Sequence, residues 1–287
     1  MQRAINDTGL EVNAIGLGAM PLSIAGRPDE AQAYAVIAAF VEAGGNFIDT
    51  ANVYCLDDTD LGHNERLIDR ALRQIGKRDE AVIATKGGCR RPRGAWTMDG
   101  SPEWLRSSCE KSLKDLNTEA ITLYQLHAVD PRVDLRVSLE ALINLKEEGK
   151  ILHIGLSNIG PEHLEMALAY TPIASVQNRC NPFFKEDLKN GLIEICRQRG
   201  IAYLPHSPVG GHHGHRRLPR DPLFQRLSIK YEASPYRIAL AWLLHKGEHI
   251  IPITGASKVS SVLDSAGAVD ITLAQEDINA IDRILDG

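Results

Sequence analysis

Short runs rich in valine, isoleucine and leucine alternate with longer segments of helical periodicity along the whole chain. Several of the short runs are apolar at successive positions, which is typical of parallel strands covered on both faces. Eight β/α units in one continuous rhythm favour a closed (β/α)8 TIM barrel, forming one domain over residues 1–287. The expected strands are 15–18, 46–49, 81–85, 121–126, 151–156, 174–177, 201–205 and 250–252.

The segments between these strands carry recognisable helix ends. Serine followed by proline, as at Ser101 and Ser234, is a favourable helix start, and glycines that accept positive φ close several segments. A hairpin at 8–12 is expected to plug the bottom of the barrel, and a helix at 274–285 to close the chain. The other expected helices cover 28–44, 101–115, 137–148, 188–199 and 234–247.

An open dinucleotide-binding sheet is disfavoured, because the stretch 16–21 has Pro21 where a third glycine should stand. The span 210–220, rich in glycine, histidine and arginine, is expected to be a long functional loop. Its histidines, His212, His213 and His215, lack a cysteine or carboxylate at ligand spacing, so no metal site is expected. The arginines of this loop could fold over a cofactor pyrophosphate.

The composition excludes several classes of protein. With 32 Lys and Arg against 37 Asp and Glu the net charge is −5, which disfavours binding to nucleic acid or to an anionic membrane. Apolar runs fall short of the roughly 20 residues that cross a bilayer, and the N-terminus lacks the features of a signal peptide. Five cysteines without a Cys-x-x-Cys pair favour reduced thiols. We expect a cytoplasmic protein, either a monomer or a weak homo-oligomer.

Three successive strands each end in an ionisable residue: Asp49, Lys86 and His127, with Tyr54 in the loop after the first strand. Active-site groups of a β/α barrel lie at the C-terminal ends of its strands. Any one of these residues alone could be a cap, a rim aromatic, a solvated lysine or a histidine bonded to backbone. Together they would need four separate structural explanations, so one common site is favoured.

These four residues have a shared chemical logic. Tyrosine, with a pKa of about 10, exchanges protons poorly near neutrality unless its phenolate is stabilised. Lys86 is expected to lower the pKa of Tyr54, while Asp49 holds Lys86 charged and oriented. A neutral His127 would donate a hydrogen bond to a substrate carbonyl oxygen as Tyr54 supplies the proton. Because side chains cannot supply hydride, a nicotinamide cofactor is needed.

The ordered motifs at 47–54, 85–88, 123–127, 155–158 and 176–178 resemble the aldo-keto reductase superfamily, over about residues 10–285. The resemblance implies a (β/α)8 barrel that binds NADPH or NADP+ in extended form. It also implies that Asp49, Tyr54, Lys86 and His127 are the catalytic tetrad, with Tyr54 as general acid.

The resemblance further implies a set of cofactor contacts. Ser157, Asn158 and Gln177 would hold the nicotinamide carboxamide, although Ser157 and Asn158 could equally be an ordinary helix N-cap before Pro161. The other expected contacts are Gly18, Ala19, Met20, Asp49, His206, Ser207, Val209, Gly210, Gly255, Ser257, Lys258, Asp264 and Ser265.

Several positions depart from the family pattern. His206 stands where relatives stack an aromatic ring on the nicotinamide, so a titrating ring would make cofactor affinity depend on pH. Lys258 is the candidate partner of the adenosine 2′-phosphate, favouring NADPH over NADH, or else a solvated lysine at a helix start. Ser261, where many relatives have a longer polar or basic residue, weakens the first interpretation. Asp264 and Ser265 replace the common Glu-Asn.

Residues 55–61 form an insertion after Tyr54 that alters the mouth of the site. Its carboxylates, Asp57, Asp58 and Asp60, would repel an anionic substrate. The loop after Lys86 contains Arg90, Arg91, Arg93 and Trp96. These residues would attract an anionic substrate, unless the arginines and the carboxylates pair with each other.

The expected activity is NADPH-dependent reduction of small aldehydes or ketones to alcohols, or the same path reversed. Within the superfamily, pyridoxal reductase and aldose 1-dehydrogenase are alternatives. A Schiff-base aldolase with Lys86 as nucleophile is a rival enzyme class. An alternative that is not an enzyme is a regulatory subunit that senses NADPH.

Overall fold

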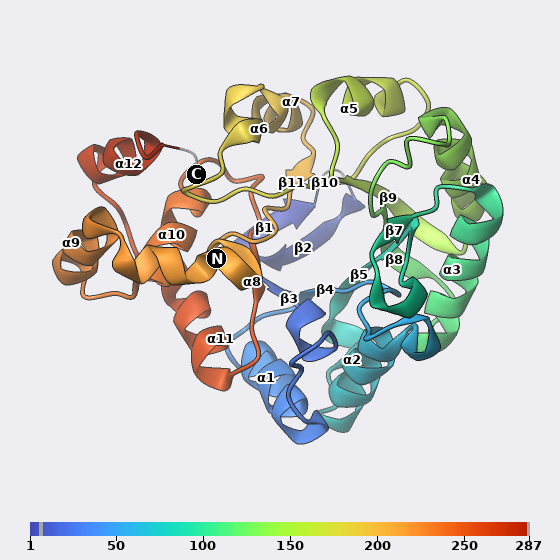
Figure 1. The fold of residues 1–287 in the computed structure, drawn as a ribbon, viewed down its shortest axis with the longest axis horizontal. Coiled ribbons are helices and arrows are strands. Elements are labelled where there is room, and N and C mark those ends of the chain that lie inside the picture. The colour runs from blue at the N-terminus through green and yellow to red at the C-terminus, as the bar shows by residue number, and fades with distance from the viewer. Residues whose placement is uncertain (6–7, 286–287) are drawn as a thin grey trace.

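Eight parallel strands form the central sheet of the computed structural model, which describes residues 1–5 and 8–285. Parallel bridges from Tyr203 to Ile250 and from His206 to Ile253 join the two edges, so the sheet closes into a barrel (Figure 1). The expected (β/α)8 barrel is confirmed. The strands follow one another around the sheet as β11 (Ala202–Tyr203), β10 (Ser175–Gln177), β9 (Ile151–Ser157), β8 (Ile121–Leu126), β5 (Val82–Gly87), β4 (Phe47–Asp49), β3 (Gly16–Gly18) and β12 (Ile253–Gly255).

Helices surround the barrel on its outer face (Figure 1). The side chains of Asp29, Ser101 and Ser234 cap three of them at the expected starts. The helices are α1 (Glu30–Glu42), α2 (His63–Gln74), α3 (Pro102–Asp115), α4 (Leu135–Glu147), α5 (Pro161–Leu168), α6 (Glu186–Lys189), α7 (Leu192–Gln198), α8 (Gly211–Gly214), α9 (Pro222–Tyr231), α10 (Pro235–Leu244), α11 (Val259–Ala266) and α12 (Gln275–Asp282). A small hairpin of β6 (Cys89–Arg90) and β7 (Thr97–Met98) follows β5.

The ends of most expected elements shift by a few residues in the structure, and two elements differ more clearly. The helix expected at 188–199 is divided into α6 and α7, because Gly191 adopts a φ of 85° and begins a new helix. The last strand is 253–255 rather than 250–252. The chain at Ile251 pairs with Tyr203 on one side of the closure, and only from Ile253 onward does it pair with β3.

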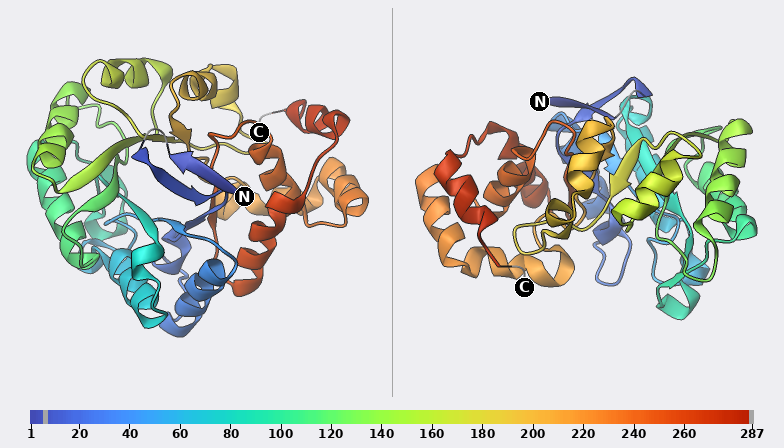
Figure 2. Two further views of the ribbon diagram at one scale, coloured as in Figure 1. Left: turned by 180° about the vertical axis from the view of Figure 1, so that it is seen from behind. Right: turned by 90° about the horizontal axis from the view of Figure 1, so that it is seen from above.

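The N-terminal hairpin lies across one end of the barrel (Figure 2). It pairs β1 (Gln2–Ile5) with β2 (Leu10–Asn13), so it is longer than the expected 8–12. The prediction missed β1 because this strand alternates exposed and buried residues and only half of it is apolar. Ile5 and Val12 are fully buried in the cluster that fills the barrel, which is the expected plug. At the other terminus, Ala274 is the N-cap of α12.

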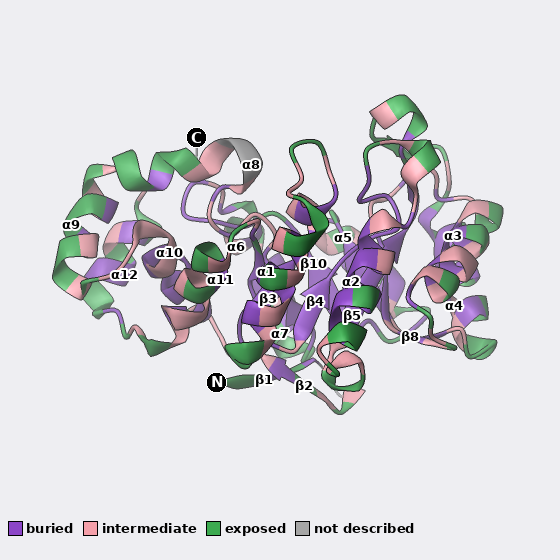
Figure 3. Cartoon of the chain, turned by 90° about the horizontal axis from the view of Figure 1, so that it is seen from below, coloured by how far each residue is buried: buried purple, intermediate pink, exposed green. Residues whose placement is uncertain are grey.

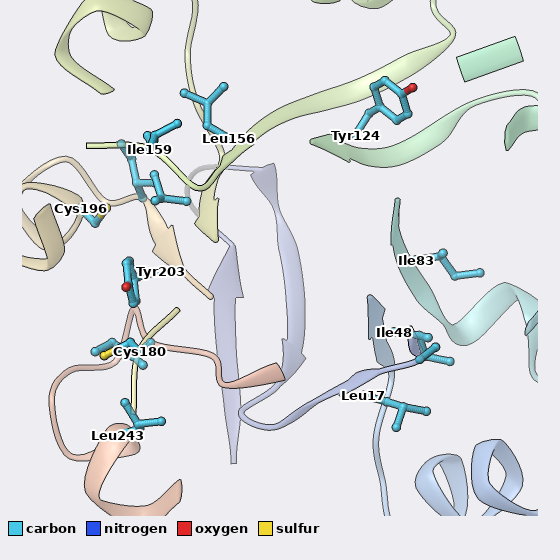
Figure 4. Close-up of a cluster of buried hydrophobic side chains, with 14 of the residues drawn as sticks. Leu17, Ile48, Ile83, Tyr124, Leu156, Ile159, Cys180, Cys196, Tyr203 and Leu243 are labelled. Carbon is cyan, nitrogen blue, oxygen red and sulfur yellow. The ribbon is translucent and has the colours of Figure 1, made fainter. Parts of the chain in front are cut away.

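Along each strand, one residue points into the barrel interior and the next points outward to the helices. Phe47 and Leu123 belong to the interior cluster, whereas their neighbours Ile48 and Tyr124 pack between sheet and helices. Figure 4 shows this outer layer from Leu17 round to Tyr203, and in Figure 3 buried residues follow the strands and the inward helix faces. The period of two therefore fixes which strand residues can reach the interior.

Glu65 is a carboxyl group buried between α2 and the sheet. Its Oε1 accepts a hydrogen bond of 2.5 Å from the hydroxyl of Thr85, the residue before Lys86. Burial raises the pKa of Glu65 from 4.5 to about 7, and the Thr85 hydroxyl offsets only part of that effect. Glu65 is therefore largely protonated in the folded protein at mildly acidic pH.

We predict that Glu65→Gln removes a pH dependence of stability. Because folding raises the pKa of this carboxyl, its contribution is complete below pH 4.5 and is lost as pH rises through 7. The loss is on the order of 3 kcal/mol, at about 1.4 kcal/mol for each pKa unit. Urea unfolding between pH 5 and 8 should show the wild type losing stability relative to the variant; parallel pH profiles would contradict the prediction.

Candidate active site

At the C-terminal end of the strands, the barrel interior changes from apolar to polar. Two residues beyond the inward-facing Phe47, Ala84 and Leu123, the same strands present Asp49, Lys86 and Gln125, and β10 adds Gln177. All four side chains are buried. Gln125 escaped prediction, although its signal was present: a polar residue inside an apolar strand, at the inward position two residues before His127.

Asp49 is the hub of this polar layer. Its Oδ1 accepts a hydrogen bond from Lys86 Nζ at 2.5 Å, and its Oδ2 accepts bonds from Gln177 Nε2 at 2.7 Å and Gln125 Nε2 at 3.1 Å. A buried carboxylate is costly unless it is paired and hydrogen-bonded, and here both conditions are met. The hub therefore ties four strands together through a single charged group.

Lys86 connects this hub to Tyr54. Its ammonium also donates to the carbonyl of Thr50 at 2.8 Å and to Tyr54 Oη at 3.1 Å. Burial alone would lower the pKa of Lys86, but the Asp49 carboxylate and Tyr54 raise it above its ordinary value. Lys86 is thus a charged donor with its three N–H groups engaged.

The phenol of Tyr54 corrects one expectation from the sequence. Burial raises the pKa of Tyr54 above 10, and the attraction of Lys86 offsets only part of that rise. The expected net lowering is therefore wrong. Burial is the main reason, and the Asp49 carboxylate beside Lys86 adds a smaller rise in the pKa of the phenol. Tyr54 keeps its proton at neutral pH.

His127 lies against Tyr54, with ring centroids 5.7 Å apart in an edge-to-face arrangement. Burial, and secondarily the charge of Lys86, holds the pKa of His127 well below 6.5, so its ring is neutral. Its Nδ1 is buried without a hydrogen-bond partner among the residues that the structure describes. Asp49, Tyr54, Lys86 and His127 are thus brought together as the sequence predicted.

A cavity of about 680 Å³ opens over this group and runs toward the N-terminus of α11. Of the expected cofactor contacts, only Ala19 and Gly210 lie outside its lining; Ala19 is fully buried, and Gly210 begins α8 with a φ of 99°. The expected contacts that do line it are Gly18, Met20, Asp49, Ser157, Asn158, Gln177, His206, Ser207, Val209, Gly255, Ser257, Lys258, Asp264 and Ser265.

Amide and hydroxyl groups gather beside the tetrad. Asn158 Nδ2 donates to the carbonyl of His127 at 2.9 Å, and its Oδ1 lies 3.3 Å from His206 Nε2. Asn158 and Ser207 both have positive φ, 56° and 52°, a strained conformation that concentrates at functional sites. The N-cap alternative for Ser157 and Asn158 is wrong, since Ser157 ends β9 and Gly160 caps α5.

The His206 ring also lies in this part of the cavity. Burial, together with the charges of Lys86 and Arg179, lowers the pKa of His206 to about 4. The His206 ring is therefore neutral at physiological pH.

At the end of the cavity near α11, two charged residues, Lys258 and Asp264, belong to the lining. Lys258 is exposed at the N-cap position of α11, without a side-chain capping bond, where the first backbone N–H groups of the helix also favour a phosphate. Asp264 Oδ2 accepts a hydrogen bond from the Ser234 hydroxyl, and Asp264 Oδ1 lies 3.4 Å from Arg237 Nη2. The Asp264 carboxylate is thus held by neighbouring groups of α10.

The long loop expected at 210–220 is wrong, because the span is helical: α8 is followed by a 3-10 helix at 215–220. Gly211 and His215 from this span line the cavity. The Arg217 guanidinium stacks on the ring of Phe183, 3.9 Å from its centre. The side chains of His212 and His213 are not among those that the structure describes. Within the described part, three potential metal ligands do not gather at any point, and no described helix is long and apolar enough to span a membrane.

The family model of the Aldo/keto reductase family matches residues 14–286. The chain is similar to "Probable aldo-keto reductase 1" of Glycine max, with 34% identity over 303 positions that cover 95% of this chain and 85% of the relative.

Two solved structures share the fold closely. The holo form of aldo-keto reductase AKR11C1 from Bacillus halodurans has a TM-score of 0.82 and 26% identity, covering 98% of this chain and 95% of that one. Glycerol dehydrogenase AKR11B4 from Gluconobacter oxydans has a TM-score of 0.84 and 25% identity, covering 98% and 94%.

The buried ion pair predicts a strong thermodynamic coupling. Asp49→Asn should cost about 3–5 kcal/mol, because it leaves the Lys86 ammonium buried without a counter-charge. Adding Lys86→Met should recover a large part of that loss, since neither charge is then buried. Urea unfolding of the two single variants and the double variant measures the coupling. Additive effects would show that the two charges do not depend on each other.

Proposed function

Since the chain belongs to the aldo/keto reductase family, we propose that it is an NADPH-dependent reductase of aldehydes or ketones, acting as one barrel domain. Members of this family are oxidoreductases that act on carbonyl compounds and alcohols with NAD(P)H. The resemblance expected from the ordered motifs is confirmed. The single observation that carries the proposal is the hydrogen-bonded chain from Asp49 through Lys86 to Tyr54 at the base of the cavity.

The residues of the cavity fit a nicotinamide dinucleotide. Ser157, Asn158 and Gln177 lie beside Tyr54 and His127, where amide and hydroxyl groups suit a carboxamide. Lys258 and the N-terminus of α11 suit a phosphate at the opposite end. When bound, the cofactor supplies a hydride to the substrate carbonyl carbon and is left oxidised.

Tyr54 would act as general acid in the reduction. Its phenol keeps its proton at neutral pH, and it would transfer that proton to the carbonyl oxygen as negative charge develops there. Lys86 Nζ, 3.1 Å from the phenol oxygen, would stabilise the resulting phenolate, which regains a proton from solvent. In alcohol oxidation the same groups would run in reverse, with the phenolate as base.

His127 would orient the substrate. Because its ring is neutral, one nitrogen can donate a hydrogen bond to the carbonyl oxygen without adding a charge that repels Lys86. Together, Tyr54 and His127 would fix the oxygen and thereby set the face of the carbonyl that receives the hydride.

The Schiff-base aldolase alternative is disfavoured by the state of Lys86. A nucleophilic lysine needs a free amine, commonly obtained by a lowered pKa. In this site the pKa of Lys86 is raised, and its ammonium donates to Asp49, Thr50 and Tyr54. Lys86 is therefore suited to stabilise a phenolate rather than to attack a carbonyl.

The proposed acid predicts the behaviour of Tyr54→Phe. Loss of the phenol proton should lower kcat by at least about 100-fold, the lower range for a general acid. The dissociation constant for NADPH should stay within about twofold, because the ring and its packing are retained. NADPH oxidation with an aldehyde panel gives the rate, and quenching of protein fluorescence gives the affinity.

Full activity of Tyr54→Phe would refute the acid assignment. A wild-type protein that oxidises bound NADPH once, without steady-state turnover, would favour the sensing subunit instead. Borohydride trapping of substrate on Lys86 would support the Schiff-base aldolase instead.

A further inference from the structure

The 55–61 insertion bridges the loops that follow β3 and β5. On one side, Asp60 forms a 2.7 Å ion pair with Arg27, which follows β3. On the other side, Asp58 Oδ1 accepts a hydrogen bond from the backbone N–H of Arg93, at 3.2 Å, in the β6–β7 loop. The insertion is therefore fixed at both ends to the loops that border the cavity.

Arg91 forms the centre of the second attachment. Its side chain is buried, with only 6% of the residue exposed. Its Nη2 donates to the carbonyl oxygens of Cys55 and Leu56, at 3.2 and 3.1 Å. Its guanidinium lies over the Trp96 ring, 4.2 Å from the ring centre. One side chain thus joins the insertion to an aromatic ring that lines the cavity.

Trp96 faces the reacting groups. Its ring centroid is 6.3 Å from that of Tyr54 and 6.1 Å from that of His127, and each pair meets edge to face. Such arrangements are favourable but weakly directional, so the position of an exposed ring depends on further support. Trp96 is 49% exposed, and the Arg91 guanidinium supplies support for the ring.

Three of the charged residues in these loops bond to neighbouring groups. Arg90 pairs with Asp99 at 2.6 Å and stacks on Trp104, while Arg91 and Asp60 have the partners described above. None of Arg90, Arg91 and Arg93 lines the cavity. These three arginines therefore offer no direct ion pair to a bound anion, and the anionic substrate considered from the sequence is disfavoured.

We propose that Arg91 is a positioning residue: by holding Trp96 against Tyr54 and His127, it makes the site selective for neutral carbonyl compounds with a flat aromatic body. This inference rests on the proposed reductase function, since it assigns the substrate class of the same site. A flat ring packs on the indole, whereas a short aliphatic aldehyde reaches Tyr54 without that contact. The 55–61 insertion is the anchor that Arg91 requires.

The test compares Arg91→Met with Arg90→Met. The two arginines are neighbours, each stacked on a tryptophan, but Trp104 is not among the lining residues of the cavity. With NADPH, Arg91→Met should raise KM for 4-nitrobenzaldehyde about tenfold and leave kcat/KM for propanal within about twofold. Arg90→Met should change neither value.

Trp96→Ala provides a second variant. It should lose the same preference for the aromatic aldehyde, and adding Arg91→Met to it should have little further effect, because both changes act through one ring. Equal loss of activity on both aldehydes in Arg91→Met would indicate a general structural role and overturn the proposal. Unchanged selectivity would overturn it as well.

A binding measurement separates this inference from the proposed function. Benzamide is flat, neutral and not reducible, and acetamide is its small counterpart. Calorimetry with NADP+ present should show an about tenfold weaker benzamide affinity in Arg91→Met and no change in Arg90→Met. Wild-type protein that binds benzamide in this way without reducing aldehydes would refute only the reductase; equal benzamide affinity in all three proteins would refute only the role of Arg91.

Discussion

The site depends on one buried carboxylate, that of Asp49. Within the polar layer it is the negative charge that balances the Lys86 ammonium, and it accepts bonds from two glutamines on other strands. A charge at this depth is tolerated only because each of its oxygens is bonded. The same requirement fixes the place of Lys86, and through it the hydrogen bond to Tyr54. The Asp49 carboxylate therefore both joins the strands of the barrel and positions the groups of the candidate active site.

The barrel and the tetrad could be predicted from the sequence because both follow from short-range patterns. Apolar runs mark the strands, and an ionisable residue at the end of three successive strands must reach the same rim. The pKa of Tyr54 could not be predicted in the same way, since its direction depends first on burial in three dimensions and then on the charges of Lys86 and Asp49. The division of the helix expected at 188–199 could not be predicted, because the helical periodicity continues across Gly191.

The role of the insertion also required three-dimensional information. Its acidic residues and the arginines after Lys86 appeared from the sequence as opposing fields at the mouth of the site. In the structure most of their bonds are local or to backbone, and the buried Arg91 supports Trp96 instead. A charge-rich segment thus contributes through the position of an aromatic ring, which no count of charges could have revealed.

We propose that Tyr54, supported by Lys86 and Asp49, meets the substrate oxygen beside the nicotinamide. A crystal structure with NADP+ and an unreactive carbonyl analogue would test this arrangement. In that structure the carbonyl oxygen should lie within hydrogen-bond distance of both Tyr54 Oη and the His127 ring, with Lys86 Nζ still bonded to the phenol. A nicotinamide bound away from Tyr54, or a phenol separated from Lys86, would contradict it.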